Sequence, residues 1–340
     1  MSDGEGPEGA PKTVDEVARA TGCSPTTVRL VVSGQGERYR IKAETRARIE
    51  SYVAAHGLVV NHAARSLRTK RSDAIGLIVP DLANPFFARV GAELEDRCRA
   101  RGLVLLTAST KEDPEREGRA VAGLAARGVD GLVIAACRPQ ASLAAASRRR
   151  PITTVLIDRA FPVLGLPTVV GDHRASAKRL TERLFAESRG PIRFLCGRPD
   201  LPSIADRIAG FLDAHRAAGR GDATELIRSV EVDDARAGSA AMRGLLADGV
   251  PPVFMCSSMH MLEGALSAIV STVGRIPAAT VIGTFDHHPL LDFVPNRIVS
   301  VRQNEAGIAE RAFALLAAAI DGEGASAVVD VVPSRLADHW

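Results

Sequence analysis

Residues 74–109 read AIGLIVPDLANPFFARVGAELEDRCRARGLVLLTAS and contain the unit that is repeated through most of the chain. An apolar run, AIGLIVP, is followed by helical spacing over Phe87–Arg101 and then by a second apolar run, LVLLTAS. Strands that are apolar throughout and alternate with helices are typical of a parallel sheet covered on both faces. The stretch therefore predicts a β-α-β unit.

The same alternation continues along the 340 residues. Further strands are expected at DGLVIAAC (130–137), PITTVLID (151–158), IRFLCG (192–197), VPPVFMCS (250–257) and ATVIGTF (279–285). Helices are expected at Asp113–Gly128, Ala141–Arg149, Ala175–Ser188, Ser203–Ala218, Arg236–Asp248, His260–Thr272 and Asn304–Asp321. The pattern predicts an α/β body over 73–340 made of two doubly wound parallel-sheet subdomains with a cleft between them. We expect an amino-terminal lobe of about 73–171 plus 304–328 and a carboxyl-terminal lobe of about 172–303 plus 329–340.

The segment before this body is strongly basic. Residues 12–71 contain twelve Lys and Arg against five Asp and Glu, a net charge of +7, whereas the residues after 71 carry a net charge of −1. Such a concentration of positive charge is typical of nucleic-acid binding. A solvated basic face is the alternative on charge alone.

The basic segment also has the spacing of short helices. Thr13 with Glu16 three residues later forms a capping-box pattern, and Ser24 followed by Pro25 is typical of a second helix start. A third helix is expected over Ala43–His56. Two short helices joined by a Gly-containing turn fit a helix-turn-helix motif. We therefore expect a small all-α DNA-binding domain over residues 12–58.

Two flanking segments are expected to be less structured. Residues 1–11 are acidic and rich in Gly and Pro, which predicts a disordered tail. Residues 59–72 are short, basic and Ala-rich, which predicts a hinge helix or linker that is weak on its own. Two copies brought together in a dimer could insert Leu67 into a minor groove. Packing of Leu67 on the body is the alternative.

The expected cleft has polar residues where strands end, which is where ligands bind in doubly wound sheets. These positions are Asp81 with Asn84, Ser109 with Lys111, Asp158 with Arg159, Gly197 onward, Ser257 with Ser258, and residues 284–288. Arg207 lies one turn into the helix expected from Ser203, near its positive end. Guanidinium groups bind phosphate bidentately and helix N-termini favour anions. An anionic ligand is therefore favoured, although polar strand ends also occur for purely structural reasons.

The chain resembles the lactose-repressor (LacI) family. The resemblance lies in TVDEVARATGCSPTTVRLVVSG (13–34), ETRARI (44–49) and NHAARSLRTKRSDAIGLIVPDLANPFFARV (61–90), and it continues to about residue 321. It implies a helix-turn-helix head and a periplasmic-binding-protein-like body. Residues 34–45, GQGERYRIKAET, are similar to the fructose-repressor branch, also called the catabolite repressor–activator. The chain departs from the family at Leu58 and Val60, where Tyr and Pro are common, and at Pro25, where a base-reading side chain is common.

Helix spacing and the resemblance together give the expected DNA contacts. They are Thr13, Ser24, Pro25, Thr26, Thr27, Arg29, Arg40, Asn61, Ala64 and Leu67.

The resemblance to the fructose-repressor branch extends to the cleft, through VLIDRAF (155–161), TVVGDHRASA (168–177), GRPDLPSIADRIAGF (197–211) and TFDHHPLLDF (284–293). In that branch an Asp-Arg pair and a helix arginine hold a phosphorylated fructose. The expected effector-binding residues are Asn84, Phe86, Lys111, Asp158, Arg159, Arg207, Ser258 and Asp286. Phe86 replaces a small polar residue of the branch, and His287 and His288 replace an acidic and an amide residue.

Several classes of function are disfavoured. The chain has no G-x-G-x-x-G, Walker A or G-x-S-x-G motif, so we expect no enzyme and no cofactor. Adjacent His287 and His288 seldom ligate one ion, so no metal is expected. With no long apolar segment or secretion signal, we expect a cytoplasmic location without membrane contact.

The leading hypothesis is a sugar-phosphate-responsive transcription repressor that binds operator DNA as a homodimer or a tetramer. A family regulator responding to an unphosphorylated sugar or a nucleoside, a two-lobed solute receptor and a sugar enzyme are the alternatives.

Overall fold

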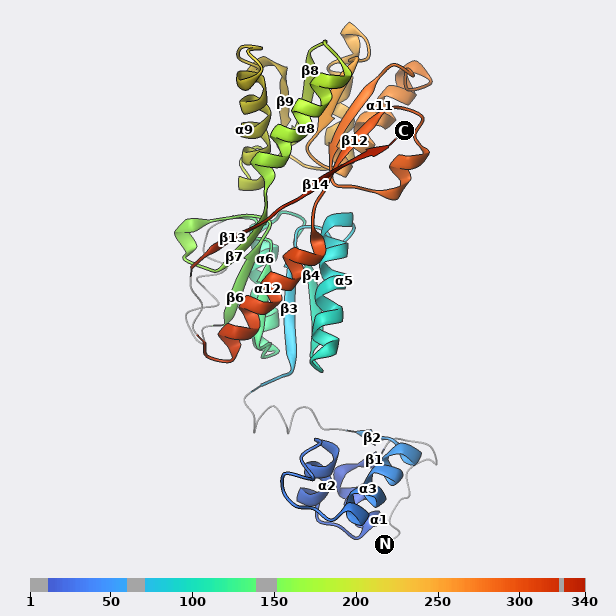
Figure 1. Cartoon of the computed structure of the whole chain (residues 1–340), viewed down its shortest axis with the longest axis vertical. Helices are drawn as coiled ribbons and strands as arrows, with labels where there is room; N and C mark the ends of the chain where they lie inside the picture. The colour runs from blue at the N-terminus through green and yellow to red at the C-terminus, as the bar shows by residue number, and fades with distance from the viewer. Residues whose placement is uncertain (1–11, 60–70, 139–151, 324–326, 340) are drawn as a thin grey trace. The chain divides into compact units, whose positions relative to one another are not determined.

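The computed structural model of the chain describes residues 12–59, 71–138, 152–323 and 327–339. It divides into two compact units, Met1–Ser72 and Asp73–Trp340, which are taken separately here (Figure 1). The expected tail over 1–11, the helix expected at Ala141–Arg149 and the hinge residues Asn61, Ala64 and Leu67 lie outside the described residues.

The first unit, which we call the head, is built on three helices. They are α1 (Val14–Thr21), α2 (Pro25–Val32) and α3 (Ala43–His56). Both expected helix starts are confirmed: Thr13 and Glu16 form a complete capping box, and Ser24 accepts a hydrogen bond from the Thr27 amide at 3.1 Å. The helices enclose a small core of Val17, Ala18, Val28, Val31 and Ile49.

The head is not entirely helical, which corrects the expectation of an all-α domain. A two-residue strand, β1 (Lys12–Thr13), pairs in parallel with β2 (Leu58–Val59). These segments lie just before α1 and just after α3, where the regular backbone hydrogen bonding of the helices has ended. Pairing satisfies the backbone groups of these segments, as buried backbone polar groups require, and the Lys12 amide extends the pairing by donating to Gly57 O at 3.2 Å.

The amino-terminal lobe of the second unit contains a six-stranded sheet in the order β13-β7-β6-β5-β3-β4. Its strands are β3 (Ala74–Val79), β4 (Val104–Ser109), β5 (Gly131–Ile134), β6 (Thr153–Ile157), β7 (Thr168–Gly171) and β13 (Val329–Val332). One face is covered by α5 (Pro85–Ala100) and α12 (Glu305–Ile320). The other is covered by α6 (Pro114–Ala126). The β-α-β unit predicted from residues 74–109 is confirmed as β3, α5 and β4.

The carboxyl-terminal lobe repeats this plan in the order β14-β12-β11-β10-β8-β9. Its strands are β8 (Ile192–Gly197), β9 (Ile227–Val230), β10 (Val253–Cys256), β11 (Val281–Phe285), β12 (Ile298–Arg302) and β14 (Arg335–His339). Its helices are α8 (His173–Glu187) and α9 (Pro202–Ala217) on one face, and α10 (Ala235–Arg243) and α11 (Met259–Val273) on the other. Short 3-10 turns lie at Pro162–Leu164, Thr224–Leu226, Leu246–Asp248 and Pro289–Phe293.

The chain passes between the two lobes three times, from β7 to α8, from β12 to α12 and from β13 to β14 (Figure 1). This corrects the expected lobe boundary, because Val329–Val332 pairs with β7 and so belongs to the amino-terminal lobe. Only β14 returns to the carboxyl-terminal sheet, where it runs antiparallel to β12. Two of these passages are joined at Asp172, at the start of α8, whose carboxylate accepts the amide of Ser334 between β13 and β14 at 2.9 Å and also accepts Arg179 Nη2 of α8 at 2.9 Å.

Two further details differ from expectation. The helix expected over Arg236–Asp248 ends at Arg243, because the chain continues through Gly244 into a 3-10 turn. In the body, the strands β7, β9, β12, β13 and β14 were not predicted as strands. Among the described residues, no helix combines the length and apolarity needed to cross a membrane.

Candidate functional site

A cavity of about 660 Å³ lies between the carboxyl ends of the strands of the two lobes. All eight expected effector-binding residues line it: Asn84, Phe86, Lys111, Asp158, Arg159, Arg207, Ser258 and Asp286. The strand-end rule therefore locates the cavity. Lining residues that were not predicted include Glu112, Arg198, Ser203, Asp233 and Gln303.

Five residues on the wall of this cavity have left-handed backbone conformations without being glycine. They are Lys111 (φ 54°), Glu112 (φ 59°), Asp158 (φ 65°), Arg198 (φ 51°) and Asp286 (φ 69°). Each follows a sheet strand within a few residues. Such conformations are costly for residues with a Cβ atom and concentrate at functional sites. The fold thus holds charged side chains at this edge in positions that an unconstrained loop would not adopt.

Arg207 is a buried cation with no ion-pair partner among the described carboxylates. It lies on α9, is 4% exposed and stacks over the ring of Phe285 at 4.1 Å. Its Nη1 donates to the carbonyl of Ser257, and its Nη2 lies 3.3 Å from Nδ1 of His173. Its Nε is buried and has no hydrogen-bond partner. A buried guanidinium in this condition is suited to bind an anion.

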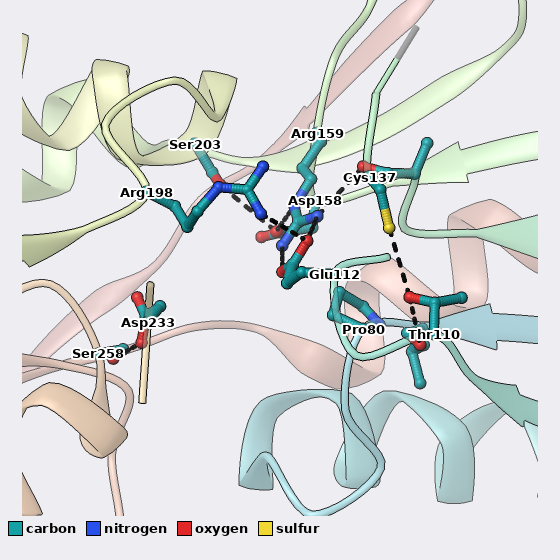
Figure 2. A network of polar contacts seen from close by, with 12 residues as sticks. Pro80, Thr110, Glu112, Cys137, Asp158, Arg159, Arg198, Ser203, Asp233 and Ser258 are labelled. Carbon is teal, nitrogen blue, oxygen red and sulfur yellow. Dashed lines mark hydrogen bonds and ion pairs between the residues drawn. The ribbon is translucent and has the colours of Figure 1, made fainter. Parts of the chain in front are cut away.

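Arg159, in contrast, is already paired. Its Nη1 and Nη2 donate to the two carboxylate oxygens of Glu112 at 2.9 and 2.5 Å, and Nη1 also donates to Ala136 O at 3.1 Å (Figure 2). The side chain is nearly fully buried. The bidentate contact occupies the two nitrogens with which an arginine grips a phosphate. Of the two arginines predicted to bind the ligand, Arg159 is therefore already ion-paired, whereas Arg207 is not.

Asp158 is held in its charged form. Burial by itself raises the pKa of this carboxyl, but a hydrogen bond from His173 and the nearby charges of Arg159 and Arg207 outweigh it and lower the pKa below its usual range. His173 Nε2 lies 3.4 Å from Oδ1, and Ser203 Oγ donates to Oδ2 at 3.4 Å. A charged, buried carboxylate is a strong hydrogen-bond acceptor for ligand hydroxyl groups.

Two more carboxyl groups on the wall have raised pKa values. Burial raises the pKa of Asp286, and the charge of Arg207 and a 2.7 Å hydrogen bond from Gln303 Nε2 only partly offset it. Burial likewise raises the pKa of Asp233, which accepts a hydrogen bond from Ser258 Oγ (Figure 2). Oε1 of Gln303 is buried without a partner. These acceptors are of the kind that bind sugar hydroxyls.

Three expected residues also have structural roles. The Asn84 side chain caps α5 by accepting from the Phe86 amide at 2.9 Å, and Ser258 caps α11 by accepting from the Met261 amide at 3.2 Å. Lys111 Nζ is 2.7 Å from Asp81 Oδ1. These side chains line the cavity but are already partly satisfied, which the sequence pattern did not reveal.

In the head, the expected DNA contacts fall into two groups. Pro25, Thr26, Arg29 and Arg40 are exposed, and Thr27 is partly buried. Thr13 and Ser24 are exposed but hold helix caps. The exposed face of α2 therefore presents the side chains expected to reach bases.

Comparisons with known proteins identify a family and relatives that match most of the chain. Residues 72–288 match the family of periplasmic binding proteins and the sugar binding domain of the LacI family. The sucrose operon repressor of Klebsiella pneumoniae is 32% identical over 327 residues, 95% of this chain and 97% of that protein. The catabolite repressor/activator of Salmonella typhimurium is 29% identical over 311 residues, 91% of this chain and 92% of that protein.

A solved structure, the Cra transcriptional dual regulator from Pseudomonas putida in complex with fructose 1-phosphate, is 28% identical with a TM-score of 0.71. The similarity covers 79% of this chain and 99% of that one. The resemblance seen in the sequence is thereby confirmed, and the chain belongs to the LacI family.

Proposed function

We propose that the protein is a DNA-binding transcription regulator that represses genes of sugar metabolism and is released from its operator by a phosphorylated sugar. The observation that carries the proposal is Arg207, a buried cation on the cleft wall without an ion pair among the described residues. A neutral sugar would leave this guanidinium without a directly ion-paired partner, whereas a phosphate would pair with it.

The carboxyl groups that line the cleft support a sugar as the body of the ligand. The carboxyl groups of Asp158, Asp233 and Asp286 offer acceptors for several hydroxyl groups. A fructose 1-phosphate complex of a relative makes this compound the first candidate. We expect its phosphate to be bound by Arg207 together with Arg159, and its hydroxyl groups to be bound by the carboxylates.

The head supplies the other half of the proposed function. Its net charge favours DNA, and α2 exposes Thr26 and Arg29 in the position of a recognition helix. We propose that two copies bind a two-fold symmetric operator through Thr13, Ser24, Pro25, Thr26, Thr27, Arg29 and Arg40, with Asn61, Ala64 and Leu67 of the hinge in the minor groove. We also propose that the chain acts in the cytoplasm and has no enzymatic activity, in keeping with relatives that are named as a repressor/activator and an operon repressor.

An electrophoretic mobility shift with DNA upstream of the chain's own gene tests the proposal. The protein should retard this DNA, and fructose 1-phosphate should release it while fructose at the same concentration does not. Release by fructose alone would make an unphosphorylated sugar the effector. Failure to bind DNA, combined with tight sugar binding, would favour a solute receptor instead.

A further inference from the structure

We infer that Glu112 is an internal anion that pairs with Arg159 and Arg198, and that the phosphate of the effector, which Arg207 also binds, displaces Glu112 from them. Glu112 then sets how much effector is needed for binding. The inference rests on the proposed function, because it concerns the phosphorylated ligand of the same cleft. It adds Glu112 and Arg198 to the residues that decide affinity.

The contacts of Glu112 are those that a phosphate would make. One carboxylate oxygen accepts from Arg159 Nη2 at 2.5 Å, and the other accepts from Arg159 Nη1 at 2.9 Å and lies 3.5 Å from Arg198 Nη1. Figure 2 shows both guanidinium groups pointing toward this carboxylate. Guanidinium pairs of this kind bind carboxylate and phosphate with the same bidentate geometry. The ligand phosphate and Glu112 therefore compete for the same donors.

The contact also spans the cleft. Glu112 follows β4 of the amino-terminal lobe, whereas Arg198 follows β8 of the carboxyl-terminal lobe and is additionally paired with Asp200 at 2.8 and 2.9 Å. Replacing Glu112 by a ligand phosphate would exchange a contact between lobes for one that passes through the ligand. Effector binding would then directly change a contact that joins the two lobes.

The backbone holds Glu112 in this position through left-handed conformations that are energetically unfavourable. Lys111 and Glu112 are consecutive left-handed residues. The loop is fixed by the Thr110 and Lys111 amides, which donate to Val79 O at 2.9 Å and Pro80 O at 2.6 Å. Strained conformations persist where the surrounding structure over-determines them and where they serve function. An unstrained loop would not direct the carboxylate at Arg159.

The competition favours one class of ligand. A phosphate monoester carries a charge of about −1.5 to −2 near neutral pH, so it can displace the single charge of Glu112. A neutral sugar has no group that can do so. Glu112 therefore weakens phosphate binding without changing the binding of unphosphorylated sugar.

Isothermal titration calorimetry with fructose 1-phosphate and fructose tests this on wild type, Glu112→Gln and the matched control Glu231→Gln. Glu231 is an exposed carboxylate at the same cavity, and among the described residues it forms no ion pair with either arginine. Glu112→Gln should bind fructose 1-phosphate about tenfold more tightly, within the usual range for linked equilibria. Its affinity for fructose should be unchanged, and Glu231→Gln should resemble wild type. Equal or weaker binding of fructose 1-phosphate by Glu112→Gln would overturn the inference.

A second measurement is independent of the sugar. Inorganic phosphate should raise the thermal midpoint of Glu112→Gln more than those of wild type and Glu231→Gln, because only this variant leaves the arginine pair open to an anion. Glu112→Asp keeps the charge and should behave like wild type. If wild type does not bind fructose 1-phosphate at all, the proposed effector is wrong, yet this phosphate comparison still decides the role of Glu112. Equal phosphate-induced shifts in all four proteins would contradict it.

Discussion

Single side chains on the cleft wall differ in whether their charge is already satisfied. Arg159 is matched by Glu112, whereas Arg207 donates only to a neutral carbonyl and contacts a histidine nitrogen. Neutral partners do not offset a buried positive charge as a carboxylate does. A ligand anion therefore gains most binding free energy at Arg207, which has no direct ion pair among the described residues.

Substitution of Arg207 should remove the binding free energy that a phosphate gains from its guanidinium. Arg207→Gln should weaken fructose 1-phosphate binding by about 100-fold, as expected when one partner of a buried charge pair is removed. Calorimetry should show a much smaller effect on fructose. Arg216→Gln is the control, because Arg216 lies on the last turn of the same helix and is exposed. Equal losses for both sugars would place the phosphate elsewhere.

Asp286 should limit stability at neutral pH. Burial raises its pKa, so its pKa in the folded state lies above that in the unfolded state. The charged form then costs stability above this raised pKa, and the cost is relieved as the pH falls through it. Asp286→Asn keeps an oxygen for Gln303 and should raise the thermal midpoint at pH 7 by about 2 to 4 °C.

The pH dependence of the thermal midpoint tests whether burial of the Asp286 charge is the cause of this increase. The difference between Asp286→Asn and wild type should shrink in thermal scans at successively lower pH. Glu263→Gln, at an exposed residue on the same cavity, should not change the midpoint. A gain for Asp286→Asn that is the same at every pH would show that charge burial is not its source.

At the scale of elements, the second helix of the head depends on its cap. Ser24 Oγ accepts from the Thr27 amide at 3.1 Å, and Pro25 occupies the first helical position. Ser24→Ala should destabilise α2 by about 1 kcal/mol, seen as faster amide hydrogen exchange at Val28 and Val31. Thr26→Ala is the control, since Thr26 is exposed and does not provide the cap. Similar exchange in both variants would contradict the role of the cap.

Elements that depend on local pattern could be predicted, whereas those that depend on distant pairing could not. Continuous apolar runs revealed β3, β8 and β11 because their residues are buried on both faces. β9 has no buried residue, and β13 has two exposed residues, one partly buried residue and only one buried residue, Val332. Both lie at sheet edges, so nothing in their own sequence states which sheet they join. That is why Val329–Val332 was assigned to the wrong lobe.

In the candidate site, too, features that depend on local sequence could be predicted, whereas contacts between distant residues could not. The strand-end rule located six of the eight expected lining residues because it depends only on where strands stop, whereas Arg207 was found from the start of its helix and Phe86 from the family resemblance. It could also have found Glu112 and Arg198, which follow β4 and β8 within a few residues. It could not show that Glu112 pairs with Arg159, 47 positions away, because this requires the spatial order of the strands and a left-handed loop.

At the scale of the molecule, the two units should separate without loss of the body. Removing residues 1–71 takes away the first unit and leaves both sheets complete. The shortened protein should bind fructose 1-phosphate with unchanged affinity in calorimetry but should not retard operator DNA. Binding of the intact protein should weaken steeply with salt, because phosphate contacts release counterions. Operator affinity that is the same at low and high salt would contradict the role of the head.

The two proposed ligands should also oppose each other across the molecule. If the effector releases the protein from DNA, it binds the DNA-free state more tightly. Operator DNA must then weaken effector binding by the same factor, typically about 5- to 150-fold. Titration of fructose 1-phosphate with and without saturating operator measures this factor. Equal affinities would show that this compound binds but does not induce.

The three passages between the lobes also affect how the protein is made. As the ribosome extends the chain, the head can fold early because its helices are contiguous. The core of the amino-terminal lobe stays open until α12 emerges, because Ile308, Phe313 and Leu316 fill it. The carboxyl-terminal sheet is complete only with β14, which ends at His339. Neither lobe can finish folding while the other is still being translated. Both close only when residues 305–339 have been translated, and until then each exposes an unfinished apolar face to chaperones.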